Sequence, residues 1–107
     1  MPFDVYDRSV ELIDQLAAPA AALERRDRDL ANQLRRAASS IVLNIAEGRR
    51  RDGKDQRYLF RVAAGSAEET RACLHVAAAW GHIDAASAEA PLATLDRVAA
   101  MLYRLTH

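Results

Sequence analysis

The sequence predicts an all-α fold, an antiparallel up-down-up-down four-helix bundle, and three observations support this prediction. Hydrophobic residues make up 50% of the 107 residues and aromatic ones only 6%, and a chain this rich in Ala and Leu favours helix. Apolar residues recur at steps of three and four, which is the helical period. Short polar stretches divide the chain into four such segments, so consecutive helices should be antiparallel neighbours. The length suits one domain, residues 1–107.

The first predicted helix begins near Asp4 or Asp7 and reaches about Leu23. Pro19 lacks a backbone N–H and should end or bend this helix near Ala18. Two adjacent apolar stripes cover about half of the circumference, which is more than one core face needs. The stripes consist of Tyr6, Val10, Ile13 and Ala17, and of Val5, Leu12, Leu16 and Leu23.

The second predicted helix begins at Asp27 or Asp29, either of which can cap it, and ends around Gly48. Its core stripe is Leu30, Leu34, Ala37, Ile41 and Ile45. The third helix is expected to begin near Lys54 and to end before Gly81, a residue type that commonly follows a helix. Its inward positions are expected to be Tyr58, Val62, Cys73, Val76, Ala77 and Trp80.

The fourth predicted helix has Asp84 or Ser87 as its cap. Pro91 is tolerated in a first turn but not in a helix interior, and this favours Ser87. The apolar stripe of this helix is Leu92, Leu95, Val98 or Ala99, Leu102 and Leu105.

A polar stripe accompanies the core stripe of the second helix and falls within about 80° of its circumference. On the third helix, Ser66 and Glu69 occupy positions expected to face inward. An inward carboxylate needs hydrogen-bonding partners, for which Gln33, Arg36 and Asn44 are the candidates. This polar seam is predicted to fix the register of the two helices, and a buried ligand or catalytic pocket is the alternative. The seam comprises Gln33, Arg36, Ser40, Asn44, Glu47, Ser66 and Glu69.

The same region resembles a known family. Residues 33–52, QLRRAASSIVLNIAEGRRRD, and residues 58–74, YLFRVAAGSAEETRACL, are similar to the four-helix bundle family first noted in intervening sequences of bacterial large-subunit rRNA genes. The matching residues are Gln33, Arg35, Arg36, Ala37, Ala38, Ser40, Ile41, Asn44, Ile45, Ala46, Glu47, Gly48, Tyr58, Phe60, Ala63, Gly65, Ser66 and Glu69. The loop at residues 24–29, ERRDRD, departs from the family pattern. The resemblance implies a bundle that assembles as a ring, commonly a homopentamer, with a nucleic-acid connection and no established enzymatic activity.

The net charge of the chain is zero but unevenly distributed. Residues 1–24 carry −4, residues 25–61 carry +6 and residues 62–107 carry −2. Neighbouring helices or subunits of complementary charge are one interpretation, and an anionic partner at the middle of the chain is the other.

Most of the net positive charge of residues 25–61 belongs to the turn expected between the second and third helices, where six bases are opposed only by Asp52 and Asp55. Of the aromatic residues, only Tyr58 and Phe60 are interleaved with the bases, which argues against base-specific recognition. We hypothesise weak, sequence-independent binding of RNA or DNA through phosphates. The basic segment comprises Arg49, Arg50, Arg51, Lys54, Arg57 and Arg61, and a second cluster, Arg25, Arg26 and Arg28, is expected at the opposite end of the bundle.

No pattern predicts a catalytic, cofactor or metal site. The Glu-x-x-His pairs of di-metal bundles do not occur, and His75, His82 and His107 are expected to be solvated. Cys73 lies on an apolar stripe without an activating base and should be a buried thiol. One cysteine suits a reducing compartment. With neither a signal peptide nor a membrane span expected, the sequence predicts a cytoplasmic protein.

The interpretation is a non-enzymatic homo-oligomer, with a pentamer favoured by the resemblance and RNA or DNA as the candidate partner. Leu43 points away from the core stripe of its helix and, with the wide apolar surface of the first helix, indicates burial between chains. The alternative is a structural or adaptor protein whose ring holds another protein.

Overall fold

The computed structural model describes residues 2–107, with side chains from Asp4 onward. The chain forms four helices: α1 (Pro2–Glu24), α2 (Arg28–Gly48), α3 (Gly53–Ala79) and α4 (Ala85–Thr106). Over residues 2–107 there is no strand. The all-α prediction with four helices is therefore confirmed.

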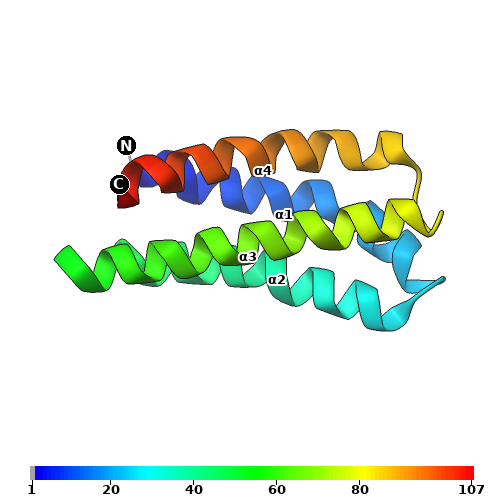
Figure 1. Cartoon of the computed structure of the whole chain (residues 1–107), viewed down its shortest axis with the longest axis horizontal. Coiled ribbons are helices and arrows are strands. Elements are labelled where there is room, and N and C mark those ends of the chain that lie inside the picture. The colour runs from blue at the N-terminus through cyan, green and yellow to red at the C-terminus, as the bar shows by residue number, and fades with distance from the viewer. Residues whose placement is uncertain (1) are drawn as a thin grey trace.

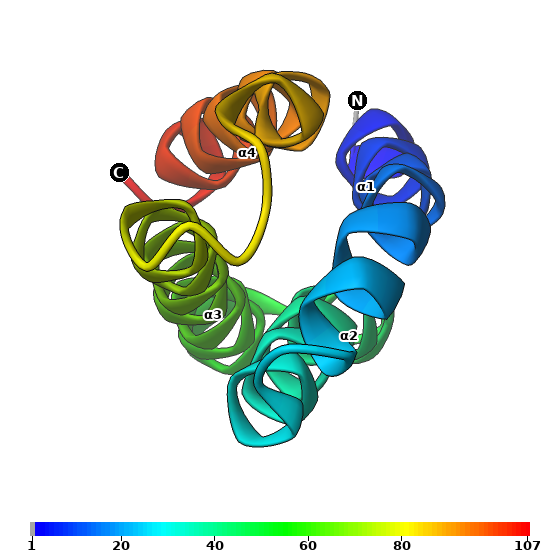
Figure 2. The same ribbon diagram turned by 90° about the vertical axis from the view of Figure 1, so that its right-hand side faces the viewer.

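The helices lie side by side and form an elongated body of 42 × 22 × 19 Å. Seen end-on, they surround a central core, with α1 beside α2, α2 beside α3, α3 beside α4, and α4 beside α1 (Figure 2). The α1–α2 and α3–α4 connections lie at one end of the body, whereas the α2–α3 turn lies at the other end together with both ends of the chain (Figure 1). The two clusters of bases in the connections are thereby separated by the length of the bundle.

The core is built mainly from leucine, isoleucine and alanine. All but one of the predicted core positions of α2 are buried, and Leu30 is half-buried. The largest fully buried side chains are Phe60, Leu12, Leu23, Leu34, Ile41, Ile45, Leu74, Leu95 and Leu102. Alanine contributes many of the remaining contacts, which allows the helix axes to approach closely.

The sequence predicts that α1 ends or bends near Ala18. The helix does not end there, because it continues through Pro19 to Glu24. A proline inside a helix removes one backbone hydrogen bond. Beyond it, Ala20 and Leu23 are 3% and 0% exposed. The burial of these side chains offsets the lost hydrogen bond and keeps the last turns helical.

The fourth helix differs from its prediction for the same reason. It begins at Ala85 after Asp84 instead of after Ser87, so that Pro91 lies inside it. Pro91 and Ala88 are buried against the other helices, and tertiary packing again outweighs a local preference. The Ser87 hydroxyl donates a hydrogen bond of 2.7 Å to the carbonyl oxygen of Asp84.

The predicted boundaries of α2 and α3 agree with the structure. Of the two candidate caps of α2, the structure selects Asp27, whose Oδ1 accepts a hydrogen bond of 3.0 Å from the N–H of Leu30. Gly81 follows α3 with a φ of 77°, a left-handed conformation that glycine adopts without steric cost. The N–H groups of Gly81 and His82 donate to the carbonyls of Ala78 and Ala77 at 2.9 Å each, which is the Schellman pattern.

The predicted inward face of α3 is partly wrong. Cys73 and Ala77 are buried as expected, but Tyr58, Val76 and Trp80 are 66%, 43% and 71% exposed. The inward stripe instead follows Phe60, Ala63, Ala67, Thr70, Cys73, Leu74 and Ala77. Small alanines mark the close helix contact on this helix, whereas the large amphipathic aromatics remain in water.

Gly48 is required by close packing at the α2–α3 end. A Cβ atom added there would lie 2.7 Å from Cε1 of Phe60 and 3.2 Å from Cβ of Leu59. Because Phe60 is 1% exposed, its ring cannot turn toward solvent without leaving the core. The same atom added at Gly65, within α3, would meet nothing within 4 Å.

Gly48→Ala is therefore expected to lower the free energy of unfolding by about 1–3 kcal/mol, the usual cost of overpacking. Gly65→Ala is the matched control and is expected to raise it by about 0.5–1 kcal/mol, since alanine has the higher helix propensity. Urea unfolding of both variants measures the difference. Equal effects of the two substitutions would contradict the packing at Gly48.

Candidate nucleic-acid interface

The basic segment begins in a tight turn whose backbone is well connected. The N–H groups of Arg50 and Arg51 donate to the carbonyls of Glu47 and Gly48 at 3.2 and 3.0 Å. The Gln56 side chain reaches back from α3 and donates to the carbonyls of Gly48 and Arg51 at 3.2 and 2.9 Å. These bonds fix the turn, so the bases project from a defined scaffold.

Three bases of the segment already have a partner within the chain. The Arg49 guanidinium lies 4.2 Å from the centroid of the Tyr6 ring on α1, a cation–π distance. Arg51 forms an ion pair of 2.6 Å with Glu47. Arg61 donates from Nη2 to the carbonyl oxygen of Thr106 at 3.2 Å and so links α3 to the end of α4.

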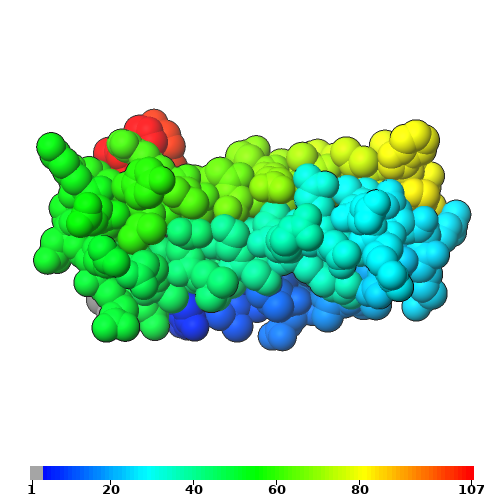
Figure 3. All heavy atoms as spheres, turned by 90° about the horizontal axis from the view of Figure 1, so that it is seen from below, coloured from blue at the N-terminus to red at the C-terminus, as the bar shows by residue number. Residues whose placement is uncertain are grey.

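The other three bases, Arg50, Lys54 and Arg57, are exposed. Among the residues whose side chains are described, no carboxylate lies within ion-pair distance of them. Lys54 and Arg57 are three residues apart and share one side of α3. Side chains of the α2–α3 turn and the start of α3 form one end of the molecular surface (Figure 3, green). The structure thus leaves three unpaired cations at that end.

The two aromatics of the segment differ in their placement. Tyr58 is 66% exposed, whereas Phe60 is 1% exposed and packs beneath the turn. Phe60 is therefore not available to a ligand. The rings of Tyr103 and His107, which no sequence pattern connects to the basic segment, stack at the C-terminal end of α4, beside the residue that Arg61 contacts. Only the packing of α3 against α4 could have placed them there.

The polar seam exists but is smaller and more solvent-exposed than predicted. Ser40 and Ser66 are joined across α2 and α3 by a hydrogen bond of 2.8 Å between their hydroxyls. Asn44 donates from Nδ2 to the hydroxyl oxygen of Ser40 at 3.0 Å and to its carbonyl oxygen at 2.9 Å. These three residues are half-buried, and they connect the two helices near their middle.

The prediction that Glu69 faces inward is wrong, because this residue is exposed. Its carboxylate meets Gln33 of α2 at 3.5 Å, which is the outer limit of a hydrogen bond. Glu47 pairs with Arg51 instead of joining the seam, and Arg36 is exposed beside Leu43. The error follows from the wrong phase assigned to α3. A carboxylate in water needs no buried partners, so this seam does not form the enclosed pocket that was considered as an alternative.

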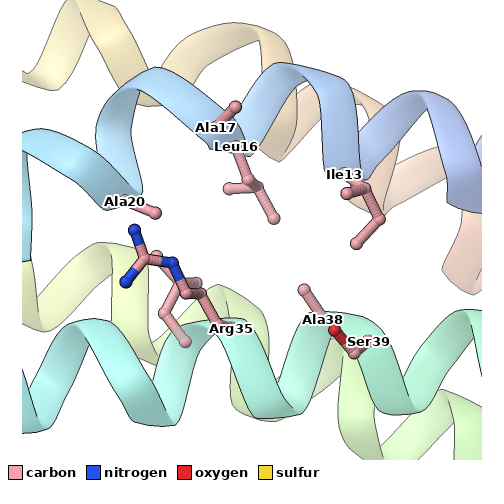
Figure 4. A pocket seen from close by; sticks show the side chains of 8 residues that line it. Ile13, Leu16, Ala17, Ala20, Arg35, Ala38 and Ser39 are labelled. Atoms are coloured by element: carbon pink, nitrogen blue, oxygen red, sulfur yellow. The ribbon is translucent and has the colours of Figure 1, made fainter.

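A hollow of about 350 Å³ lies between α1 and α2. Ile13, Leu16 and Ala20 point into it from α1, and Ala38 points into it from α2 (Figure 4). Arg35 lies at one end of the hollow and forms an ion pair of 2.6 Å with Glu24. The hydrogen bond and the charge of Arg35 lower the pKa of the Glu24 carboxyl. The hollow is mostly apolar.

An exposed apolar surface continues from this hollow across both helices. Val10 and Ile13 of α1 are 38% and 37% exposed, and Leu43 of α2 is 67% exposed. A second, shallower hollow is lined by these residues together with Val42, Ser39 and Asp14. We call Val10, Ile13, Val42 and Leu43 the apolar surface. It corresponds to the surplus of apolar residues noted on the first helix in the sequence.

The described part of the chain contains no cluster of three or more His, Cys, Asp or Glu residues with the geometry of a metal site. His75 is exposed, as predicted. Cys73 is 3% exposed, and burial raises the pKa of its thiol, which agrees with the expected buried thiol. Within the residues described, no helix combines the length and the apolar character that crossing a membrane requires.

Comparison with known proteins agrees with the resemblance seen in the sequence. The model of the 23S rRNA-intervening sequence protein family matches residues 1–104. The chain belongs to this family. The chain is similar, with a TM-score of 0.85, to a solved structure from Bacteroides thetaiotaomicron VPI-5482. That structure is described as a protein with unknown function from the S23 ribosomal protein family. The two share 20% identity over 95% of this chain and 97% of that one, a likeness that shows the fold. No curated protein matches the chain.

Proposed function

We propose that this chain is an antiparallel up-down-up-down four-helix bundle that acts in the cytoplasm as a non-enzymatic, self-associating protein and binds nucleic acid weakly through its α2–α3 end. The alternating ends at which the helices connect support the antiparallel arrangement (Figure 1). The observation that carries the binding role is the group of three unpaired cations, Arg50, Lys54 and Arg57. A binding role is favoured over catalysis because Glu69, the one carboxylate considered for a pocket, is exposed.

Phosphates suit these cations for a physical reason. A cation that replaces a condensed counterion on a polynucleotide releases that ion to bulk solution, which favours binding at low salt. Contacts of this kind position a protein on the backbone and carry no sequence information. Non-specific binding of this type has dissociation constants of about 10⁻⁴ to 10⁻⁶ M at physiological salt. The name of the family, which refers to 23S rRNA, agrees with an RNA ligand.

The two ends of the bundle differ in their charge balance. Residues 49–61 contain six bases and two acids, whereas residues 24–29 contain three bases and three acids. The loop at residues 24–29 therefore has as many acids as bases and carries no net charge. This difference supports the α2–α3 end as the binding surface and makes the opposite end a matched control.

Self-association is proposed from the apolar surface. Val10, Ile13 and Leu43 expose a third to two thirds of their area, which a second copy of the chain would remove from water. The flanks differ in charge, with Asp14 on the α1 side and Arg35 and Arg36 on the α2 side. A ring is built from head-to-tail contacts between two different surfaces, and the apolar surface would supply one of the two. The resemblance implies a ring of five.

An adaptor role is the second candidate, and the apolar surface supports it, since another protein could cover the same side chains. Affinity capture of the tagged protein with and without nuclease treatment separates the two candidates. Partners that disappear with nuclease favour nucleic-acid binding. Partners that persist favour the adaptor.

The binding role is tested by removing the three unpaired charges. The variant Arg50→Gln, Lys54→Gln, Arg57→Gln should bind a fluorescein-labelled single strand at least about tenfold more weakly at low salt, since about three phosphate contacts are lost. The control Arg25→Gln, Arg26→Gln, Arg28→Gln removes the same charge from the opposite end and should change affinity much less. Fluorescence anisotropy measures both variants. Equal losses would show that only net charge matters and would overturn the assignment to the α2–α3 end.

A further inference from the structure

We propose that the edge between α3 and α4 beside the basic segment holds unpaired bases of a single-stranded nucleic acid, with Tyr103 as the platform on which a base stacks. This inference rests on the proposed nucleic-acid binding and specifies its ligand as single-stranded. The inference is based on two neighbouring features, a stacked pair of exposed rings at the end of α4 and a row of cations at the start of α3.

The two rings lie in an open position. Tyr103 and His107 stack with a centroid separation of 3.9 Å and an angle of 15° between their planes. Nδ1 of His107 lies 3.1 Å from the carbonyl oxygen of Tyr103 and 3.1 Å from the hydroxyl of Thr106. The imidazole is thereby held against one face of the phenol ring. Tyr103 as a whole remains 61% exposed, so its ring surface is available for a further stacked ring.

The rings face the edge shared with α3. Arg71 of α3 forms an ion pair of 2.7 Å with Asp96 of α4, which shows that this side of α4 is turned toward α3. Tyr103 follows Asp96 by seven residues, or about two helical turns, and so lies on the same side. At the end of the bundle, Arg61 donates to the carbonyl of Thr106 at 3.2 Å. A guanidinium is thus anchored at the residue next to His107.

The cations form a row on the neighbouring helix. Lys54, Arg57 and Arg61 follow one another at steps of three and four residues and lie on one side of α3. Asp55 is the acid within this turn of the helix, and it is offset by about 100° from Lys54 around the axis. Arg104 follows Tyr103 directly and is exposed. A strand whose phosphates follow the cations would bring a base to Tyr103.

This arrangement favours a single strand over a duplex. Base stacking on an aromatic side chain needs a base whose face is free, and a cationic groove with stacking aromatics is the usual form of single-strand binding sites. A duplex conceals the faces of its bases and can use the cations alone. The opposite end of the molecule has a related pair, Trp80 and His82, but with a centroid separation of 6.4 Å and beside a charge-neutral loop.

The test uses two labelled strands of about 12 nucleotides, within the site sizes of single-strand binders: oligo-deoxyadenylate and an abasic strand with the same number of phosphates. The wild-type protein should bind the adenine strand more tightly than the abasic one by fluorescence anisotropy. Tyr103→Ala should weaken binding of the adenine strand about 5- to 150-fold, the range for removal of a base-stacking aromatic, and should leave binding of the abasic strand unchanged. Tyr103→Phe keeps the ring and should bind as the wild type does.

Trp80→Ala is the matched control and should not change the affinity for either strand. Circular dichroism of each variant confirms folding, which is expected because both side chains are exposed. If Tyr103→Ala and the wild type bind the adenine strand equally, or if Trp80→Ala weakens binding as much, the stacking site is overturned while the basic segment retains its proposed role. If the wild type binds neither strand at low salt, the proposed function itself fails.

Discussion

Replacing Phe60 with alanine is expected to lower the free energy of unfolding by about 3–5 kcal/mol, the usual cost of removing a fully buried aromatic side chain. The ring is 1% exposed and heads the largest fully buried side chains of the core. It also lies against the Gly48 position, beneath the turn that carries the basic segment. A domain of this size has about 5–15 kcal/mol of stability in total, so the variant should be close to unfolding.

Urea unfolding followed by circular dichroism measures this loss. Tyr58→Ala is the control, since Tyr58 lies two residues away and is 66% exposed, and its removal should cost no more than about 0.5 kcal/mol. In the sequence, Tyr58 and Phe60 belong to the same basic stretch, and nothing there distinguishes the buried ring from the exposed one. If Tyr58→Ala were the more destabilising of the two, the orientation of α3 described above would be wrong.

Leu43→Asp is expected to convert the proposed oligomer into monomers while the helix content stays within the range of the wild type. Leu43 is 67% exposed in the single chain, so the substitution disturbs no internal packing. Inside a contact between chains, however, a carboxylate would lose its hydration and would put a charge where the contact needs an apolar side chain. Because a ring repeats the contact at every interface, one substitution weakens all of them.

Light scattering at micromolar concentration gives the mass of each variant. Ala93→Asp adds the same charge at an exposed position of α4 and should leave the assembly intact. A wild-type protein that has the mass of one chain would contradict self-association altogether. If the oligomer persists in Leu43→Asp but not in Ala93→Asp, the contact between chains lies on the other side of the bundle.

The helices themselves could be predicted from the sequence because the apolar period and the caps act locally. Asp27 and Gly81 perform the predicted roles at the start of α2 and after α3. Two prolines in helix interiors show the limit of such rules. Pro19 and Pro91 both lie inside helices, because burial of the residues around them stabilises the helix by more than the missing hydrogen bond costs.

The placement of the candidate site could be predicted only in part. That the α2–α3 turn is basic follows from the sequence, but which bases are unpaired depends on contacts with distant residues, such as Tyr6 beneath Arg49 and Thr106 beside Arg61. The error at Glu69 has a different origin. An inward face that includes Tyr58 and Trp80 is rotated away from the alanines of α3 that form the contact, and Glu69 belongs to that rotated face.

The most direct test of the central claim, that the α2–α3 end binds polynucleotide phosphates, is a salt titration with the wild-type protein. Fluorescence anisotropy of a labelled single strand is measured between about 50 and 200 mM salt, a range over which phosphate contacts weaken strongly. With about three phosphate contacts, the logarithm of the association constant should fall against the logarithm of salt concentration with a slope of about −2. No change in anisotropy at about 50 mM salt, with protein up to about 10⁻⁴ M, the weak limit of non-specific binding, would contradict the account.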